Sequence, residues 1–166
     1  MNRWDVIGGL LCGRNPKLGA EIGVKEGRFL YSLLSRYQDL TMYAVDPWEE
    51  QPEGNETYSE WNFPKIYNEY KQKTKGFKDR VIEIRDYSET AHKIVMDGSL
   101  DFVFIDAQHD FASVKQDISL WAPKVKCGGL LAGHDYNHVK FPGVVKAVHG
   151  VCNPNLGDND VWYTWI

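Results

Sequence analysis

The sequence predicts one α/β domain in which helices cover both faces of a mostly parallel sheet. Its 166 residues match the size of a single compact domain. Short apolar segments alternate along the chain with segments of helical periodicity, which is typical of strand–helix–strand units. Residues 100–106 (LDFVFID) are apolar almost throughout, as expected of a strand that helices bury on both sides.

The first half of the chain is expected to hold three strands and three helices. The leading segment, residues 1–16, contains a short helix at 3–12 that two adjacent glycines weaken. A loop is expected at 47–56, and a third helix within 57–75, where Pro64 either interrupts the helix or begins it. The expected strands are residues 18–23, 41–46 and 80–85. The second helix follows the first strand, where apolar residues recur at helical spacing: Phe29, Leu30, Leu33, Leu34 and Tyr37.

The second half continues the alternation after a helix at 88–96. A helix follows the buried strand and stops before Pro123, and another begins with a proline at 142–149. The helix that stops before Pro123 has an apolar face formed by Phe111, Val114, Ile118 and Trp121. The remaining strands are expected at 128–135 and 160–166. Ligands of such sheets bind at the carboxyl ends of the strands, so the candidate site residues are sought there.

Composition excludes several classes of protein. A hydrophobic content of 43% and a charged content of 25% exclude a disordered or fibrous chain. The net charge of −4 gives no general attraction to nucleic acid or anionic membranes. No apolar run approaches the ~20 residues that span a bilayer, so we expect a cytoplasmic protein. The three cysteines lack a CxxC pair, which indicates reduced thiols rather than a disulfide framework or zinc site: Cys12, Cys127 and Cys152.

The turn after the first strand carries an acidic residue and two glycines. Glu21, Gly23 and Gly27 form an E-x-G-x-x-x-G pattern that leads into a helix. Glycine lets the backbone approach a ligand closely, and an acidic turn favours an ammonium group over a phosphate. The alternative is a plain tight turn. The second strand ends in Asp46, where nucleotide-binding α/β units place a carboxylate that accepts the ribose hydroxyls; a strand-end residue capping the Pro47 turn is the alternative.

The third strand leads to Asp86-Tyr87-Ser88. Ser88 or a backbone N–H there can contact an adenine edge, and Tyr87 or Trp48 can pack on its face. Ser88 also suits the N-cap of the next helix, and the two roles are compatible.

The strongest pattern pairs two acidic strand ends. Asp106 follows one apolar strand and Asp135 follows the next. Carboxylates at neighbouring strand ends repel each other unless a positive group lies between them, which suggests a divalent cation such as Mg²⁺. His109 and His134 lie beside them, and a neutral imidazole can accept a proton from a substrate hydroxyl. The alternative is that Asp106 caps a helix and His134 packs in the core.

Five features carry a resemblance to a known family: the glycine turn, Asp46, FIDAQH (104–109), WAPKVKCGGLLAGHDY (121–136) and GVVKAV (143–148). Together they resemble the S-adenosylmethionine-dependent methyltransferases of the Rossmann-like class, and more narrowly methyltransferase family 24. That family is similar to the macrocin and mycinamicin sugar O-methyltransferases and to catechol-type O-methyltransferases. The resemblance covers residues 17–166 and implies a seven-stranded, mostly parallel sheet with an antiparallel last strand.

The resemblance also implies roles for individual residues. The cofactor S-adenosylmethionine would contact Asp106 in addition to the glycine turn, Asp46 at the ribose and Ser88 near adenine. Asp106 and Asp135 match metal-ligand positions of the metal-dependent relatives, and His134 stands where those relatives have a carboxylate. A divalent ion would therefore be held by Asp106, His134 and Asp135. His109 matches the general base, with Asp106 as its catalytic companion.

The expected function is therefore methyl transfer to the oxygen of a small sugar or phenol, assisted by a divalent metal. Segment 47–76, rich in aromatic residues, forms either a lid over this acceptor or a helix packed on the sheet. Two other functions are alternatives: a non-catalytic cofactor-binding module, and a nicotinamide-dependent oxidoreductase, which the missing G-x-G-x-x-G motif disfavours. The aromatic residues of the tail either pack inside or form a homodimer interface: Trp162, Tyr163 and Trp165.

Overall fold

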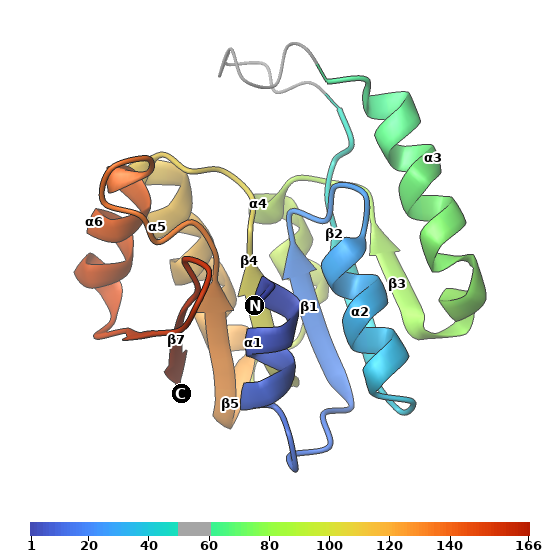
Figure 1. The fold of residues 1–166 in the computed structure, drawn as a ribbon, viewed down its shortest axis with the longest axis horizontal. Helices are drawn as coiled ribbons and strands as arrows, with labels where there is room; N and C mark the ends of the chain where they lie inside the picture. The colour runs from blue at the N-terminus through green and yellow to red at the C-terminus, as the bar shows by residue number, and fades with distance from the viewer. Residues whose placement is uncertain (50–60) are drawn as a thin grey trace.

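A computed structural model of the protein describes residues 1–49 and 61–166. It contains a seven-stranded sheet in the order β3-β2-β1-β4-β5-β7-β6 (Figure 1). Strands β1 to β5 are parallel, and β7 runs antiparallel to both β5 and β6, as the resemblance implied. The strands are β1 (Leu18–Ile22), β2 (Thr41–Val45), β3 (Val81–Ile84), β4 (Leu100–Ile105), β5 (Val125–Gly133), β6 (Asn155–Leu156) and β7 (Trp162–Trp165).

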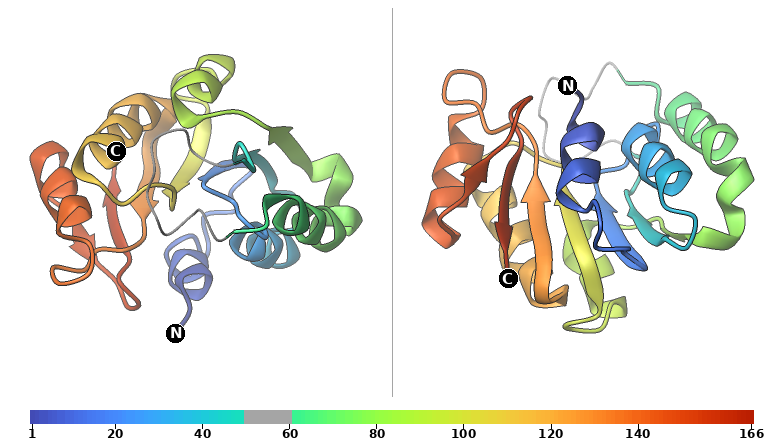
Figure 2. Two further views of the ribbon diagram at one scale, coloured as in Figure 1. Left: turned by 90° about the horizontal axis from the view of Figure 1, so that it is seen from above. Right: turned by 60° about the horizontal axis from the view of Figure 1, so that its bottom comes forward.

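Helices cover both faces of this sheet, with α1, α2 and α3 on one side and α4, α5 and α6 on the other (Figures 1 and 2). Pro64 lies in the first turn of α3, so this helix begins there rather than being interrupted. Among the described residues, none of the helices is long and apolar enough to cross a membrane. The helices are α1 (Arg3–Leu10), α2 (Arg28–Arg36), α3 (Phe63–Thr74), α4 (Ser88–Ala91), α5 (Phe111–Trp121) and α6 (Pro142–Val151).

The central strand β4 contributes apolar side chains to both faces of the sheet, so helices pack on each face. Phe102 and Phe104 are fully buried among residues of α1, α2 and α3, and Phe104 stacks on Phe29 with ring centroids 4.1 Å apart. Val103 and Ile105 point to the opposite face, where they pack against α5 and α6. Because successive side chains of a strand point to opposite faces, a continuous apolar run gives each helical layer its own core.

Two strands differ from the sequence-based expectation. β5 begins at Val125, ahead of the predicted start at residue 128. Lys126, Cys127 and Gly128 are exposed and interrupt the apolar pattern, so the sequence does not mark this part of the strand. β6 is a pair of exposed residues, Asn155–Leu156, at the edge of the sheet, and the sequence analysis missed it. The aromatic tail residues pack within the domain: Trp162 is fully buried, and Tyr163 and Trp165 lie against the core on the α1 side.

The register of the parallel strands brings four strand ends to one edge. Ile22 pairs with both Val45 and Ile105, and Ile105 pairs with Gly133. The next residues continue the ladder: Asp106 N–H donates to the Ile22 carbonyl at 2.7 Å, and His134 N–H donates to the Ile105 carbonyl at 3.0 Å. The chain segments that follow β1, β2, β4 and β5 therefore meet at this edge.

Candidate active site

An open cleft of about 1070 Å³ lies over this edge. Ligand pockets commonly have volumes of about 300–1,000 Å³, so the cleft has room for a cofactor and a small second molecule. The four acidic residues that the sequence indicates as cofactor or metal ligands all line it: Glu21, Asp46, Asp106 and Asp135. Gly23, Ser88, His109 and His134 line the same cleft.

The glycine turn after β1 is tightly packed on the segment after β4. Gly23 has a φ of +86°, and a Cβ atom at this position would lie 2.3 Å from the carbonyl oxygen of Asp106. Only glycine fits, because it accepts the left-handed conformation and occupies no space beyond its backbone. Gly27 is the N-cap of α2 with a φ of +70°, and its missing side chain leaves room for Tyr70.

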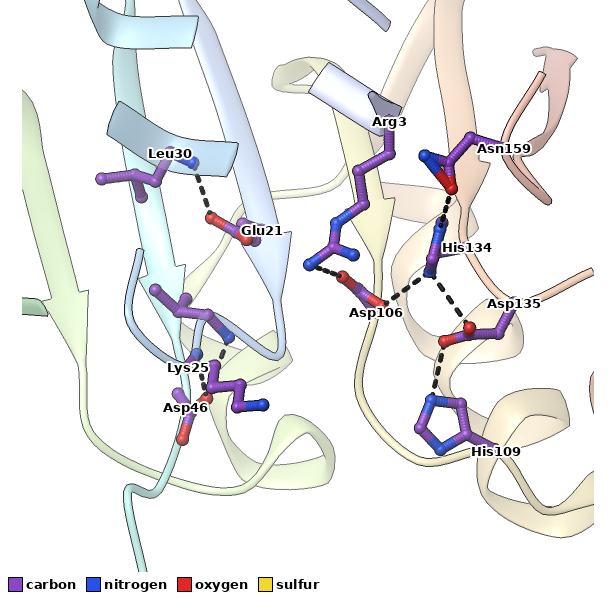
Figure 3. A network of polar contacts seen from close by, with 11 residues as sticks. Arg3, Glu21, Lys25, Leu30, Asp46, Asp106, His109, His134, Asp135 and Asn159 are labelled. Carbon is purple, nitrogen blue, oxygen red and sulfur yellow. Dashed lines mark hydrogen bonds and ion pairs between the residues drawn. The ribbon is translucent and has the colours of Figure 1, made fainter. Parts of the chain in front are cut away.

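Asp46, which follows β2, holds this turn in place by accepting hydrogen bonds from its backbone (Figure 3). Its Oδ2 atom accepts hydrogen bonds from the backbone N–H groups of Val24 and Lys25, both at 2.9 Å, and its Oδ1 atom accepts from Trp48 N–H at 2.7 Å. Burial raises the pKa of Asp46, and these three hydrogen bonds oppose the increase. The turn-capping alternative is therefore observed. The carboxylate also lines the cleft, and Oδ1, which accepts one hydrogen bond, has a second lone pair for a ligand hydroxyl.

Glu21 is the most deeply buried acid of the cleft, with an exposed fraction of 1%. Its Oε2 atom accepts a hydrogen bond from Leu30 N–H of α2 at 3.1 Å. Burial, followed by the nearby charge of Asp106, raises its pKa well above the ordinary value, although Arg3 opposes this. A cationic ligand in the cleft would relieve the cost of this buried charge, and the ammonium group of an amino acid fits that requirement.

Asp106 has a partner that the sequence analysis missed. Arg3 of α1 lies beside the end of β4 and forms an ion pair of 3.0 Å with Asp106 Oδ2 (Figure 3). Asp106 does not cap α5, since Asp110 does so by accepting from the backbone of Ala112 and Ser113. Arg3 was missed because its position over β4 depends on how α1 packs on the sheet, which no local pattern reports.

His134 lies between the two strand-end carboxylates. Its Nδ1 atom is 3.5 Å from Asp106 Oδ1 and 3.1 Å from Asp135 Oδ1. Burial alone would lower the pKa of His134, but hydrogen bonds to the two carboxylates and their charges outweigh burial and raise the pKa to about 10. The positive group expected between the two acids is therefore supplied by the chain itself.

His109 forms a pair with Asp135. Its Nε2 atom lies 2.7 Å from Asp135 Oδ2, and its ring stacks on Phe141 with centroids 4.5 Å apart. Burial opposes ionisation of Asp135, but hydrogen bonds from His109 and His134 hold its pKa well below the usual range. An ionised carboxylate only accepts, so the N–H at Nε2 of His109 donates this hydrogen bond.

The donor set of Asp106, His134 and Asp135 is compatible with a divalent ion. One ligand atom from each residue lies within 4.8 Å of the others. Two carboxylate oxygens and an imidazole nitrogen suit Mn²⁺, Fe²⁺ or Zn²⁺ better than Mg²⁺, which prefers oxygen ligands throughout. Such an ion would have to displace the proton that His134 shares with both carboxylates.

Ser88 is not the N-cap of α4, which was one of the two roles expected from the sequence. The N-cap of α4 is Tyr87, which makes no side-chain capping bond, and Ser88 is the first helical residue. The Ser88 hydroxyl donates instead to Asp117 Oδ1 of α5, and it accepts from Trp121 Nε1 at 3.1 Å. Ser88 and Asp117 both line the cleft. Asp117 was not singled out from the sequence.

The aromatic segment divides into two groups. Trp48 and Tyr70 are buried, and their rings stack with centroids 4.5 Å apart, so they hold α3 against the glycine turn. Trp48 is therefore not placed to cover an adenine ring. Trp61 and Phe63, in contrast, line the cleft. Tyr58 and most of the loop predicted at 47–56 lie outside the described residues.

Solved structures share this architecture. A protein from Staphylococcus aureus assigned as a caffeoyl-CoA O-methyltransferase has a TM-score of 0.73 and 20% identity, covering 98% of this chain and 82% of its own. CalS11, a calicheamicin methyltransferase, has a TM-score of 0.67 and 16% identity, covering 97% and 78%. Rv0187 from MTB, solved with its cofactor, has a TM-score of 0.68 and 14% identity, covering 94% and 75%. At these identities the likeness establishes the fold alone. No curated protein matches the chain.

The sheet order and the acidic strand ends around one cleft define a Rossmann-like α/β enzyme domain. The profile of a methyltransferase domain, that of methyltransferase family 24, matches residues 20–136. The chain belongs to this family and is an S-adenosylmethionine-dependent methyltransferase.

Proposed function

We propose that the protein transfers the methyl group of S-adenosylmethionine to a hydroxyl oxygen of a small sugar or phenol. The observation that carries this proposal is the pairing of His109 with Asp135 at 2.7 Å, beside Asp106 and inside the cleft. A carboxylate that holds an imidazole in one tautomer is the arrangement of a general base. The similar structures include an enzyme described as a TDP-rhamnose 3'-O-methyltransferase, which supports a sugar hydroxyl as one candidate acceptor.

The cofactor would lie along the strand ends from β1 to β3. Glu21 would receive the methionine ammonium group, the turn at Gly23 and Gly27 would lie along the methionine chain, and Asp46 would accept the ribose hydroxyls. Ser88 would contact adenine, and the carboxylate of Asp106 would lie near the positive sulfur. The acidic lining supports this arrangement, because the bound sulfonium and ammonium groups would offset charges that are otherwise buried.

The chain would then need to align the acceptor oxygen with the methyl carbon and remove the hydroxyl proton. Alignment is a positioning task, and Trp61 and Phe63 at the cleft offer apolar surface to a ring. His109 would take the proton at Nδ1, and Asp135 would stabilise the imidazolium that forms. Proton transfer of this kind contributes about 10²–10⁴-fold to the rate.

A divalent ion, where bound, would be held by Asp106, His134 and Asp135 and would lower the pKa of the acceptor hydroxyl. The ion pair of Arg3 with Asp106 and the bridging position of His134 give the same carboxylates cationic partners from the chain. The proposed proton transfer to His109 is therefore the same whether or not an ion is bound.

Calorimetric titration with S-adenosylhomocysteine tests the cofactor assignment. We expect binding to the unmodified protein, weaker binding to Asp46→Ala, and no binding of NAD. Equal affinity in the Asp46→Ala variant would remove Asp46 from the ribose site. A preference for NAD would favour a nicotinamide-dependent oxidoreductase instead.

Turnover then tests catalysis against a non-catalytic module. We expect a panel of sugars and phenols to yield S-adenosylhomocysteine with the unmodified protein. His109→Ala should abolish this turnover while retaining cofactor affinity, whereas His138→Gln, an exposed histidine, should not. Full activity of His109→Ala would exclude it as the base, and cofactor binding without turnover on any acceptor would favour the module.

A further inference from the structure

A polar contact between α4 and α5 also lines the cleft. Ser88 is half-buried there between Asp117 and Trp121, and its hydroxyl contacts both. The proposed function brings only Ser88 to the adenine ring and leaves Asp117 unused. Asp117 is nevertheless 6% exposed, carries a carboxyl group and lines the cleft, so its position calls for an explanation.

We propose that Asp117 and Trp121 orient the Ser88 hydroxyl so that it reads the 6-amino group of adenine and rejects a 6-oxo purine. This inference rests on the proposed binding of S-adenosylmethionine. Asp117 and Trp121 are positioning residues, and Ser88 is the group that contacts the base.

The hydrogen bonds of Ser88 leave its hydroxyl only one way to contact a ligand. A serine hydroxyl has one proton to donate and two lone pairs with which to accept. The proton is donated to Asp117 Oδ1, and one lone pair accepts from Trp121 Nε1 at 3.1 Å. An indole N–H only donates and an ionised carboxylate only accepts, so neither direction can be reversed. One lone pair of Ser88 is left, and in the cleft this hydroxyl acts as an acceptor only.

The purine bases that differ at position 6 respond to this polarity in opposite ways. The 6-amino group of adenine donates two protons, whereas the 6-oxo group of hypoxanthine only accepts. A lone pair fixed toward the cleft forms a hydrogen bond with the amine and repels the oxo group. Sites that hydrogen-bond one group discriminate strongly against an analogue that leaves the buried partner unpaired.

The ionisation of Asp117 supports this assignment. Burial, only partly offset by the hydrogen bond from Ser88, raises the pKa of Asp117 to about 6. At pH 8 the group is ionised and accepts, which is the state the network requires. The charges of Glu89 and Asp110 nearby also raise this pKa.

The experiment compares S-adenosylhomocysteine with S-inosylhomocysteine, its 6-oxo analogue, by calorimetry at pH 8. The measured quantity is the ratio of the two dissociation constants. Both constants are measured on the same preparation of each protein. A misfolded fraction therefore affects both measurements equally and does not change their ratio. We expect the unmodified protein to prefer the amino compound by about tenfold or more.

Asp117→Asn changes the polarity while keeping the shape of the side chain. The amide of asparagine can donate to Ser88 Oγ, which frees the hydroxyl proton to turn toward the cleft and donate to a 6-oxo group. We expect the ratio to fall to about threefold or less. Ser88→Ala should lower it similarly, because the hydroxyl is absent. Ser119→Ala on the same helix and the exposed Asp79→Asn should keep the full ratio.

The outcomes separate the two proposals. If S-adenosylhomocysteine binds and the unmodified protein shows no preference, or Asp117→Asn keeps the full preference, the reading of the base is wrong and the proposed function stands. If neither compound binds the unmodified protein, both proposals fail. A lowered ratio in Asp117→Asn and Ser88→Ala, with the two control variants unchanged, supports the inference.

Discussion

Arg3 and Asp106 form an ion pair of 3.0 Å that joins the first helix to the end of the central strand β4. The carboxylate side chain is 9% exposed and the arginine side chain 31%. Asp106 lines the cleft and also contacts His134, so the leading helix takes part directly in the electrostatics of the site.

Replacing Arg3 with glutamine should weaken the attachment of α1. Because the ion pair is partly exposed to solvent, we expect the free energy of unfolding to fall by about 1 kcal/mol or less. Arg3→Lys should recover part of the loss. Urea unfolding followed by circular dichroism measures the change. A loss of several kcal/mol would mean that α1 depends on Arg3 far more than a partly exposed pair allows.

The same substitution should also change metal affinity. Removing the guanidinium leaves Asp106 with fewer positive neighbours, so we expect Arg3→Gln to bind Mn²⁺ several-fold more tightly than the unmodified protein does. Asp135→Asn should weaken Mn²⁺ binding, and Mg²⁺ should bind less well than Mn²⁺ throughout. Titration followed by electron paramagnetic resonance reports free Mn²⁺ directly. Asp39→Asn, which alters an exposed carboxylate, is the control.

Gly23→Ala should destabilise the fold strongly. The added methyl group would lie 2.3 Å from the Asp106 carbonyl oxygen, and the residue has a φ of +86°. Strain and overpacking together should cost about 2–4 kcal/mol. Gly9→Ala is the matched control, because nothing lies within 4 Å of its added atom in α1; we expect stabilisation by about 0.5–1 kcal/mol. Equal effects of both substitutions on the unfolding midpoint would contradict the packing described for the turn.

Glu21→Gln should stabilise the ligand-free protein and weaken its binding of S-adenosylhomocysteine. Glutamine keeps an oxygen for Leu30 N–H and removes a buried charge close to Asp106, so the ligand-free protein should melt at a higher temperature. The affinity for S-adenosylhomocysteine should fall about tenfold or more, because a charge-assisted hydrogen bond to its ammonium group is lost. Differential scanning calorimetry and titration measure the two effects. The exposed Glu69→Gln should change neither.

Asp117 should make stability depend on pH. Its folded-state pKa of about 6 lies above the ordinary value of 3.8, so the folded protein binds a proton more tightly than the unfolded chain does. This contribution to stability is present at pH 4 and is lost as the pH rises through about 6. The stability of Asp117→Asn relative to the unmodified protein should therefore increase between pH 4 and pH 7. Urea unfolding at both values checks this, with Asp79→Asn as the control.

The strand-end part of the site follows from sequence because parallel strands of known order bring their ends together. Asp106 and Asp135 each follow a strand with a readable apolar pattern, and Asp46 follows a third. The order of strands and helices could be predicted from the same apolar patterns, and the structure confirms the predicted fold. What local patterns do not report is contact between elements, and for that reason the ion pair of Arg3 with Asp106 was missed.

Asp117 did leave a signal in the sequence. Val114, Asp117, Ile118 and Trp121 follow the spacing of the buried face of α5, so a carboxylate occupies a position where an apolar residue is expected. An acid at such a position indicates a buried polar contact. The partner of that contact, Ser88, lies on another helix and is known only from the tertiary structure.

The backbone hydrogen bonds that Asp46 accepts from Val24 and Lys25 hold the glycine turn in one conformation. The turn that would hold the methionine chain is set in place before any ligand arrives, so little conformational search should accompany association. A substitution at Asp46 would then act twice, by removing a contact to the ribose and by releasing the amides of Val24 and Lys25 to exchange with solvent. Deuterium uptake at those two amides would separate the loosening of the ligand-free loop from the lost contact.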